Sequence, residues 1–313
     1  MEQNNIIITE TIKEQKFGMP PIHRIQLATE DGNAVTLSLT PQQATLLNSR
    51  FSREFLVLCS ESRFLEMIEK APNVKALEVL AQKYSLCDIC DFSDINFSGI
   101  KRMLKVIVHS LYKYPKLRCK FCYIGSPEGY RKKMNRLALG DVQTLKDFGL
   151  QYICQEDIAI QLGIMMQNYA EQIVGNHEGY IAMALSAFGL FDALLFDQND
   201  FEGYSYIKLV SDLRRSVECG FHPIGCHTPE SVAYHEIGHL IDYLCGLSKS
   251  PLLLSYTMSL SNDTIVRGLS EYAATSVSEL IAEAFAEYMC NESPRIISSR
   301  VNEIINREYK RIR

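Results

Sequence analysis

The chain contains an H-E-x-x-H motif inside an otherwise apolar segment that runs from Ser231 to Asp242. Residues four apart lie on the same face of an α-helix, so His235 and His239 can direct two imidazole rings at one metal ion. Glu236 is then placed beside that ion, where it can act as general base on a metal-bound water. The motif therefore predicts a helix that carries part of a metal site.

The flanking residues support a helix at this position. Thr228 is a good N-cap, Pro229 suits the first helical position, and Gly246 is a plausible C-terminal stop. Burying polar side chains on such a helix is costly unless they are paired or bound to metal. The alternative is a pair of core histidines satisfied by backbone carbonyls. The apolar positions of the predicted helix are Val232, Ala233, Ile237, Leu240, Ile241 and Leu244.

A third ligand is needed to complete such a site. Asp242 and Cys245 stand where a metzincin has a glycine and a third histidine, so that class is excluded. Glu279, Glu283 and Glu287 instead fall on one stripe of a later predicted helix. The alternative interpretation of this stripe is a solvated acidic face. Apolar residues fill the other side of the same helix, namely Leu280, Ile281, Ala284 and Phe285.

Together the two motifs resemble a known family. H-E-I-G-H-x-x-D is followed about forty residues later by Tyr272, six further residues, Glu279 and then x-x-Ala-Glu-Ala-Phe. This arrangement is similar to the catalytic domain of anthrax lethal factor and its relatives. Those proteins are gluzincin-type zinc metallopeptidases, and related domains occur in bacterial toxins and phage-associated proteins. The resemblance covers about the last ninety residues.

The resemblance implies a zinc-dependent endopeptidase, either a toxin or effector or a phage-associated protease. His235, His239 and Glu279 would be the zinc ligands, and Glu236 the general base. Two alternatives stay open. One is a phage or virion structural or interaction protein with a non-catalytic zinc site, and the other is a zinc hydrolase that acts on a different amide or ester.

The resemblance also implies roles for three residues around the ligands. Tyr272 would stabilise the developing oxyanion or protonate the leaving amine. Glu283 and Asp242 would lie behind the ligands, and Glu283 would orient a ligand histidine. His222 and His227 precede the motif in sequence. We interpret them as loop residues rather than ligands, because Glu279 already fills the third position.

Composition restricts the partners. The 313 residues carry a formal net charge of -5, which argues against nucleic acid as the main partner. A protein or peptide substrate is what the resemblance implies. The most apolar stretch, 180–196, is too short for a membrane span and is interrupted by Asp192. The first ten residues lack the features of a secretory signal, so a cytoplasmic location is expected, with signal-less export or virion association as alternatives.

Two C-x-x-C pairs, Cys87 with Cys90 and Cys119 with Cys122, have the spacing of a four-thiolate zinc site. The 28 residues between the pairs are many for a zinc ribbon. A strand predicted over 117–124 would also place Cys119 and Cys122 on opposite faces. We therefore favour buried thiols over a second zinc site.

The chain is predicted to be α+β, with a zincin-like domain over 96–313 that has a helix-rich body and a small mixed sheet. Residues 1–95 would form a small N-terminal α+β region of unknown role. A polar, linker-like stretch over 88–98 would mark the boundary between the two regions. The N-terminal region contains a strand pair, 24–28 and 34–39, across a turn at Asp31-Gly32, and helices from Pro41 to Lys83 with a break at Pro72. Later helices are expected near 98–114, 127–147, 156–174 and 205–218. Two strands within 180–196 are expected to supply a sheet edge above the metal.

Overall fold

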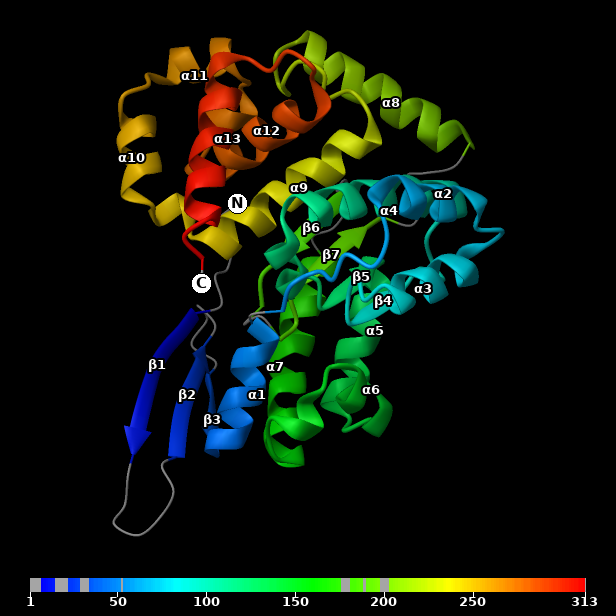
Figure 1. The fold of residues 1–313 in the computed structure, drawn as a ribbon, viewed down its shortest axis with the longest axis vertical. Coiled ribbons are helices and arrows are strands. Elements are labelled where there is room, and N and C mark those ends of the chain that lie inside the picture. The colour runs from blue at the N-terminus through cyan, green and yellow to red at the C-terminus, as the bar shows by residue number, and fades with distance from the viewer. Residues whose placement is uncertain are drawn as a thin grey trace.

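The computed structural model describes residues 7–14, 22–28, 34–51, 53–175, 181–187, 190–197 and 203–312. The described chain is α+β and mostly helical, with two small sheets (Figure 1). The coarse class expected from the sequence is therefore confirmed. The helices are α1 (Pro41–Phe51), α2 (Glu61–Lys70), α3 (Val74–Lys83), α4 (Phe97–Lys113), α5 (Pro127–Ala138), α6 (Val142–Asp147), α7 (Glu156–Gly175), α8 (Gly203–Glu218), α9 (Pro229–Cys245), α10 (Pro251–Met258), α11 (Asn262–Gly268), α12 (Val277–Cys290) and α13 (Ile296–Tyr309).

A four-stranded mixed sheet lies at the centre of the molecule. Its order is β4 (Ile89–Asp91), β5 (Tyr123–Gly125), β7 (Ala193–Phe196) and β6 (Ala182–Leu185). The first three strands are parallel, and β6 runs antiparallel to β7 at the edge. β5 and β7 are buried along their whole length, as expected for parallel strands that are covered on both faces.

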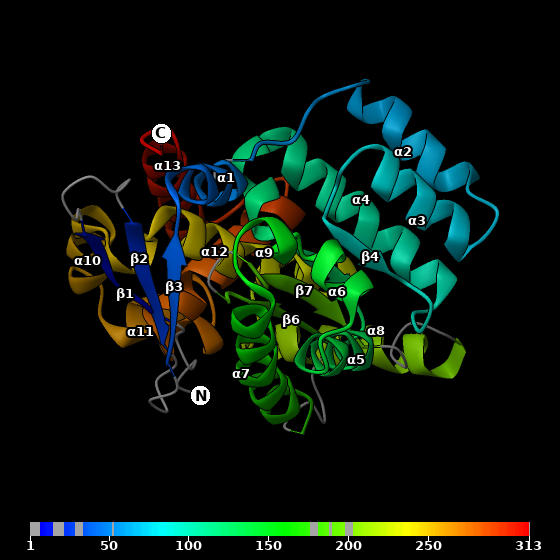
Figure 2. The ribbon, with the colours of Figure 1, turned by 90° about the horizontal axis from the view of Figure 1, so that it is seen from below.

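The sheet separates two hydrophobic cores, because successive side chains of a strand point to opposite faces. Leu194 and Phe196 of β7 join a core with α4, α9 and α12, whereas Ala193 and Leu195 join a core with α5 and α7. Figure 2 shows the sheet between these two groups of helices. The edge strand β6 lies beside α9, and this places the sheet edge next to the H-E-x-x-H helix.

The predicted strand pair near the N-terminus is confirmed. β2 (Ile22–Ala28) pairs antiparallel with β3 (Ala34–Leu39), and β1 (Ile7–Glu14) adds a third strand. The turn predicted at Asp31-Gly32 lies outside the described residues. Leu37 and Leu39 of β3 are fully buried in the core that includes α7, so this sheet packs against the main body.

Several predicted helices are confirmed with boundaries that shift by a few residues. α2 and α3 are separated at Pro72, with Asn73 as the N-cap of α3. The strand predicted over 117–124 is mostly wrong, because 3-10 helix occupies Pro115–Lys120 and only the short β5 follows. Its apparent alternation is not a pattern of faces: Leu117, Arg118 and Cys119 are all buried.

The stretch expected to be linker-like, 88–98, contains the buried strand β4. β4 pairs with β5, and α2 and α3 share a core with α4 and α9, so packing continues across residue 95. The acidic residues that suggested a linker include Asp88, which is buried by ion pairs rather than exposed to solvent. The division of the chain near residue 95 stays a prediction.

Among the helices in the described part of the chain, none combines the length and the hydrophobicity that a membrane crossing requires.

Candidate metal centre

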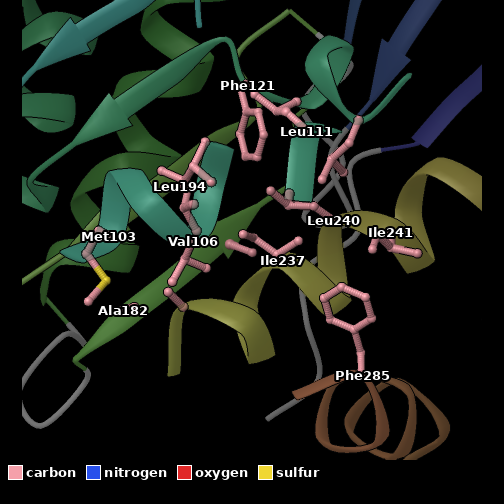
Figure 3. Packing of buried hydrophobic residues seen from close by; sticks show 14 of the residues in the cluster. Met103, Val106, Leu111, Phe121, Ala182, Leu194, Ile237, Leu240, Ile241 and Phe285 are labelled. Atoms are coloured by element: carbon pink, nitrogen blue, oxygen red, sulfur yellow. The ribbon is translucent and has the colours of Figure 1, made fainter. Parts of the chain in front are cut away.

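The H-E-x-x-H motif lies on α9, as the sequence predicts. Pro229 is the first helical residue, and Gly246 ends the helix in the left-handed conformation, with a φ of 62°. Thr228 takes the extended N-cap conformation, but its side chain makes no capping hydrogen bond. Figure 3 shows the apolar face of α9, where Ile237 and Leu240 project into the core on the side of Leu194 of β7 and Val106 of α4. This packing fixes the opposite face of α9, which carries the motif.

The helix α12 packs directly on α9. A Cβ atom at Gly238 would lie only 2.8 Å from the Cα of Ala282, so the missing side chain lets the two backbones approach closely. Ser276 caps α12 by accepting a hydrogen bond from the backbone N–H of Glu279, with the two atoms 3.1 Å apart. Glu279 is therefore held in the first turn of α12, facing the two histidines.

Three potential ligand atoms converge between the helices. The Nε2 atoms of His235 and His239 are 3.2 Å apart, and the Oε2 atom of Glu279 lies 3.2 Å and 3.5 Å from them. For ligand bonds of 2.0–2.2 Å, the vertices of a tetrahedron are about 3.3–3.6 Å apart. In the part of the chain that the structure describes, this is the only group of three or more such side chains placed to hold a metal ion. The group formed by His235, His239 and Glu279 can therefore hold a metal ion.

The hydrogen bonding of Glu279 fits the same interpretation. Its Oε2 atom is buried and accepts no hydrogen bond, although two imidazole nitrogens lie within 3.5 Å. Burial acts to raise the pKa of Glu279, but His235 and His239 outweigh it and lower the pKa well below the ordinary value. The carboxylate is thus ionised, the form in which it can bind a cation.

Glu283 lies one helical turn beyond Glu279 and is only 2% exposed. One of its oxygens, Oε1, lies 2.8 Å from Nδ1 of His235, and Oε2 accepts a hydrogen bond of 2.9 Å from the hydroxyl of Ser270. Burial acts to raise the pKa of Glu283, but contacts with His222 and His235 lower it overall. An ionised acceptor at Nδ1 fixes the proton there and leaves Nε2 of His235 for a metal.

The Nδ1 atom of His239, like that of His235, has a polar partner. It lies 3.1 Å from the hydroxyl of Ser278, and that hydroxyl donates to Asp242 over 3.3 Å. Asp242 also accepts a 2.7 Å hydrogen bond from the backbone N–H of Ser248, and burial raises its pKa. The structure therefore places Asp242 behind His239, with Ser278 between them.

Glu236 points toward the sheet edge. Its Oε2 atom accepts a hydrogen bond of 2.7 Å from the backbone N–H of Ala184, which belongs to β6. Burial raises the pKa of Glu236, and the neighbouring His235 and His239 act against that rise. A sheet edge thus lies directly beside the carboxylate, as the sequence-based hypothesis for 180–196 expects.

Tyr272 begins a short 3-10 turn, Tyr272–Ala274, before α12. Its ring stacks on the ring of His235, with centroids 5.8 Å apart and planes 18° apart. The Tyr272 ring also stacks on the ring of Phe221, with centroids 5.3 Å apart, and the backbone N–H of Tyr272 donates to the carbonyl of Phe221. The predicted phenol is therefore adjacent to a predicted ligand.

The stripe of three glutamates is not a solvated acidic face. Glu287, the last of the three, is 0% exposed and pairs with Arg295, whose Nε lies 2.9 Å from Oε1. The third glutamate is therefore structural, whereas the first two lie at the histidines.

The four cysteines of the C-x-x-C pairs do not come together as a metal site. A disulfide joins Cys87 to Cys90, and Cys119 and Cys122 are free and buried. Burial raises the pKa of the Cys122 thiol to about 12. The interpretation of buried thiols therefore holds for Cys119 and Cys122, whereas it is wrong for Cys87 and Cys90, which are joined to each other.

Several site residues escaped the sequence analysis. His222, interpreted there as a loop residue, contacts Glu283 at 3.3 Å. Ser270, Ser278 and the backbone of Ala184 carry no motif of their own. Among these residues, only Ser278 could have been suspected from the sequence, because it directly precedes the predicted ligand Glu279 at the start of a predicted helix.

Comparison with protein-family models, with curated proteins and with solved structures finds no match to this chain. The resemblance to lethal-factor-type gluzincins accordingly rests on the two motifs and their spacing.

Proposed function

We propose that this protein is a zinc-dependent metallopeptidase of the gluzincin type. The observation that supports it best is the convergence of His235 Nε2, His239 Nε2 and Glu279 Oε2 within 3.5 Å, with Glu236 on the same helix. A purely structural metal site has no need of Glu236 or of Tyr272. The presence of both beside the three ligand atoms favours a hydrolase.

The donor set favours zinc. Two imidazoles and one carboxylate are the ligands of many catalytic zinc sites, which keep a fourth position for water. Zinc bound there would polarise a carbonyl oxygen and lower the pKa of water toward neutrality. The ionised state of Glu279 and the Nδ1 partners of both histidines, Glu283 and Ser278, suit such a cation.

The chain's own residues supply the remaining steps. Glu236 would accept the proton of the attacking water, and its raised pKa brings it nearer to the working range of a general base. The hydroxyl of Tyr272 would donate a hydrogen bond to the oxyanion of the tetrahedral intermediate. An extended peptide would lie along β6, the edge strand of the sheet, which is beside Glu236.

The decisive experiment compares wild type with Glu236→Gln, a variant that keeps the size of the side chain. We expect the variant to bind one zinc per chain, because Glu236 is not a ligand. Removing the base should lower the rate of peptide cleavage about 10²–10⁴-fold. New protein N-termini in a treated lysate, read by mass spectrometry, report cleavage of any protein in the lysate, so the substrate need not be identified first.

Wild type that binds zinc but produces no new termini would favour a non-catalytic zinc protein over a peptidase. Full cleavage by Glu236→Gln would contradict the assigned base. His227→Ala serves as a matched control, because it changes a histidine of the preceding loop that is outside the group of ligand atoms.

A further inference from the structure

We infer that His222 is a positioning residue of the metal site, which acts by holding Glu283 behind the ligand His235. This inference rests on the proposed metal site and goes beyond the residues that the motifs assign. His222 lies in the loop before α9, thirteen positions ahead of His235 in sequence. The fold brings both histidines onto one buried carboxylate.

The contacts on Glu283 carry the inference. Nδ1 of His222 lies 3.3 Å from both carboxylate oxygens, while Nδ1 of His235 lies 2.8 Å from Oε1. The hydroxyl of Ser270 donates to Oε2. Three donors from three separate segments therefore meet one carboxylate, which has little freedom to rotate.

A buried carboxyl group requires such partners. Glu283 is 2% exposed, so a donor removed from it is poorly replaced by water. Because both imidazoles present Nδ1 to the carboxylate oxygens of Glu283, each is expected to carry its proton on Nδ1. For His235 this leaves the Nε2 lone pair directed at the metal, and the orientation of Glu283 sets the orientation of that ring.

His222 is anchored independently of Glu283. Its backbone N–H donates to the carbonyl of Ser216 in α8, over 3.1 Å. The adjoining loop pairs with the turn before α12, where Glu271 N–H donates to Gly220 over 2.9 Å. The ring also meets the ring of Tyr272 edge-on, with centroids 5.7 Å apart. The loop can therefore present His222 as a fixed donor.

The test measures zinc affinity by competition with a chelator, so it requires no substrate. His222→Ala removes the donor, and His222→Asn keeps an N–H close to the position of Nδ1. Losing a group that orients a ligand typically weakens metal binding about 10–100-fold, and we expect His222→Ala to lie near the lower end of that range. His222→Asn should retain most of the affinity, and the control His227→Ala all of it.

Circular dichroism and thermal unfolding of the zinc-free proteins establish that each variant folds. An affinity of folded His222→Ala equal to that of wild type would overturn the inference. If His222→Ala does not fold, the Asn variant decides: retained affinity supports the donor role, and a loss like that of Glu283→Gln overturns it. Failure of the proposed function is a separate outcome: without the metal site wild type itself would bind no zinc, and without peptidase activity wild type would bind zinc but produce no new termini.

Discussion

Two buried clusters of charged residues differ in how their carboxylates are satisfied. One surrounds Asp88, whose side chain is 9% exposed. Its Oδ1 atom accepts hydrogen bonds from Arg53 and Arg118, and its Oδ2 atom from Arg50 and Arg53, over distances of 2.5–3.1 Å. Both oxygens of Asp88 are therefore satisfied by the chain itself.

The other cluster is the candidate metal centre. The Oε2 atom of Glu279 accepts no hydrogen bond, although the nitrogens of His235 and His239 lie within 3.5 Å. Those nitrogens are arranged around a common point, while their Nδ1 atoms are held from behind. A cation at that point would satisfy all three ligand atoms.

This difference teaches how to separate a structural ion cluster from a binding site. Burial and shifted pKa values occur in both, because both hold charges away from water. What distinguishes the candidate metal centre is that three potential ligand atoms converge within 3.5 Å, whereas both oxygens of Asp88 end on donors. The stability of the Asp88 cluster should therefore be independent of metal, and that of the metal centre should not.

The largest expected effect is on the Asp88 cluster. Asp88→Asn leaves the buried guanidinium groups of Arg50 and Arg118 without a counter-charge, and breaking a buried ion pair in this way costs about 3–5 kcal/mol. Denaturant unfolding measures the loss, which should be the same with zinc or with a chelator. If the loss of unfolding free energy in Asp88→Asn depended on zinc, the proposed difference between the two clusters would be contradicted.

The next effect concerns the metal centre. Zinc that binds only the folded chain should stabilise it by about 2.7 kcal/mol when free zinc is 100 times the dissociation constant. Glu279→Gln should abolish most of this gain by removing one ligand charge, whereas Asp88→Asn should keep it. The measurement is thermal or denaturant unfolding over a zinc titration. A wild type indifferent to zinc would contradict the interpretation of the site.

A smaller effect tests the packing that brings the ligands together. Gly238→Ala would ordinarily stabilise a helix by about 1 kcal/mol. Here the new methyl group meets the backbone of Ala282 at 2.8 Å, and overpacking costs about 1–3 kcal/mol. We expect net destabilisation of the zinc-free protein, measured by unfolding, together with weaker zinc binding as α12 is displaced. A more stable variant with unchanged zinc affinity would show that the helices can separate freely.

The smallest expected effect is a pH dependence from Asp88. Burial acts to raise the pKa of Asp88, but the three arginines lower it below the ordinary value of 3.8. The ionised Asp88 therefore contributes fully to the free energy of unfolding above pH 3.8. This contribution is lost as the pH falls through the lower pKa of Asp88 in the folded state. Asp88→Asn should unfold with a shallower acid dependence than wild type in this window. If the free energy of unfolding of wild type and of Asp88→Asn changed equally with pH in this window, Asp88 would make no contribution to the acid dependence.

Local signals in the sequence predicted much of the metal helix. Pro229, Gly246 and the apolar positions between them place α9 and its boundaries, because helix caps and periodicity act over short distances. The same reasoning was wrong for 117–124, where 3-10 helix replaces most of the strand. Alternation of apolar residues is a weak guide when nearly every residue of the segment is buried, because there is then no solvent-exposed face to mark the period.

Long-range features were less accessible. The strand β4 was interpreted as linker because Asp88 and its acidic neighbours suggest exposure, and only the fold supplies the arginines that bury Asp88. His222 was interpreted as a loop residue because Glu279 already fills the third ligand position, and no local signal pointed to its contact with Glu283. A histidine in a loop has no periodicity, so its contact with Glu283 depends entirely on how the loop docks.

By itself the sequence determined that His235 and His239 share one helical face with Glu236 beside them, since that follows from the helical repeat alone. It also indicated Glu279 as a third ligand, through spacing and resemblance. Only the tertiary structure decided that Glu279 reaches the histidines, because this requires α12 to pack against Gly238. It likewise decided that β6 borders Glu236 and that His222 meets Glu283, since both contacts join segments whose separation along the chain carries no local signal.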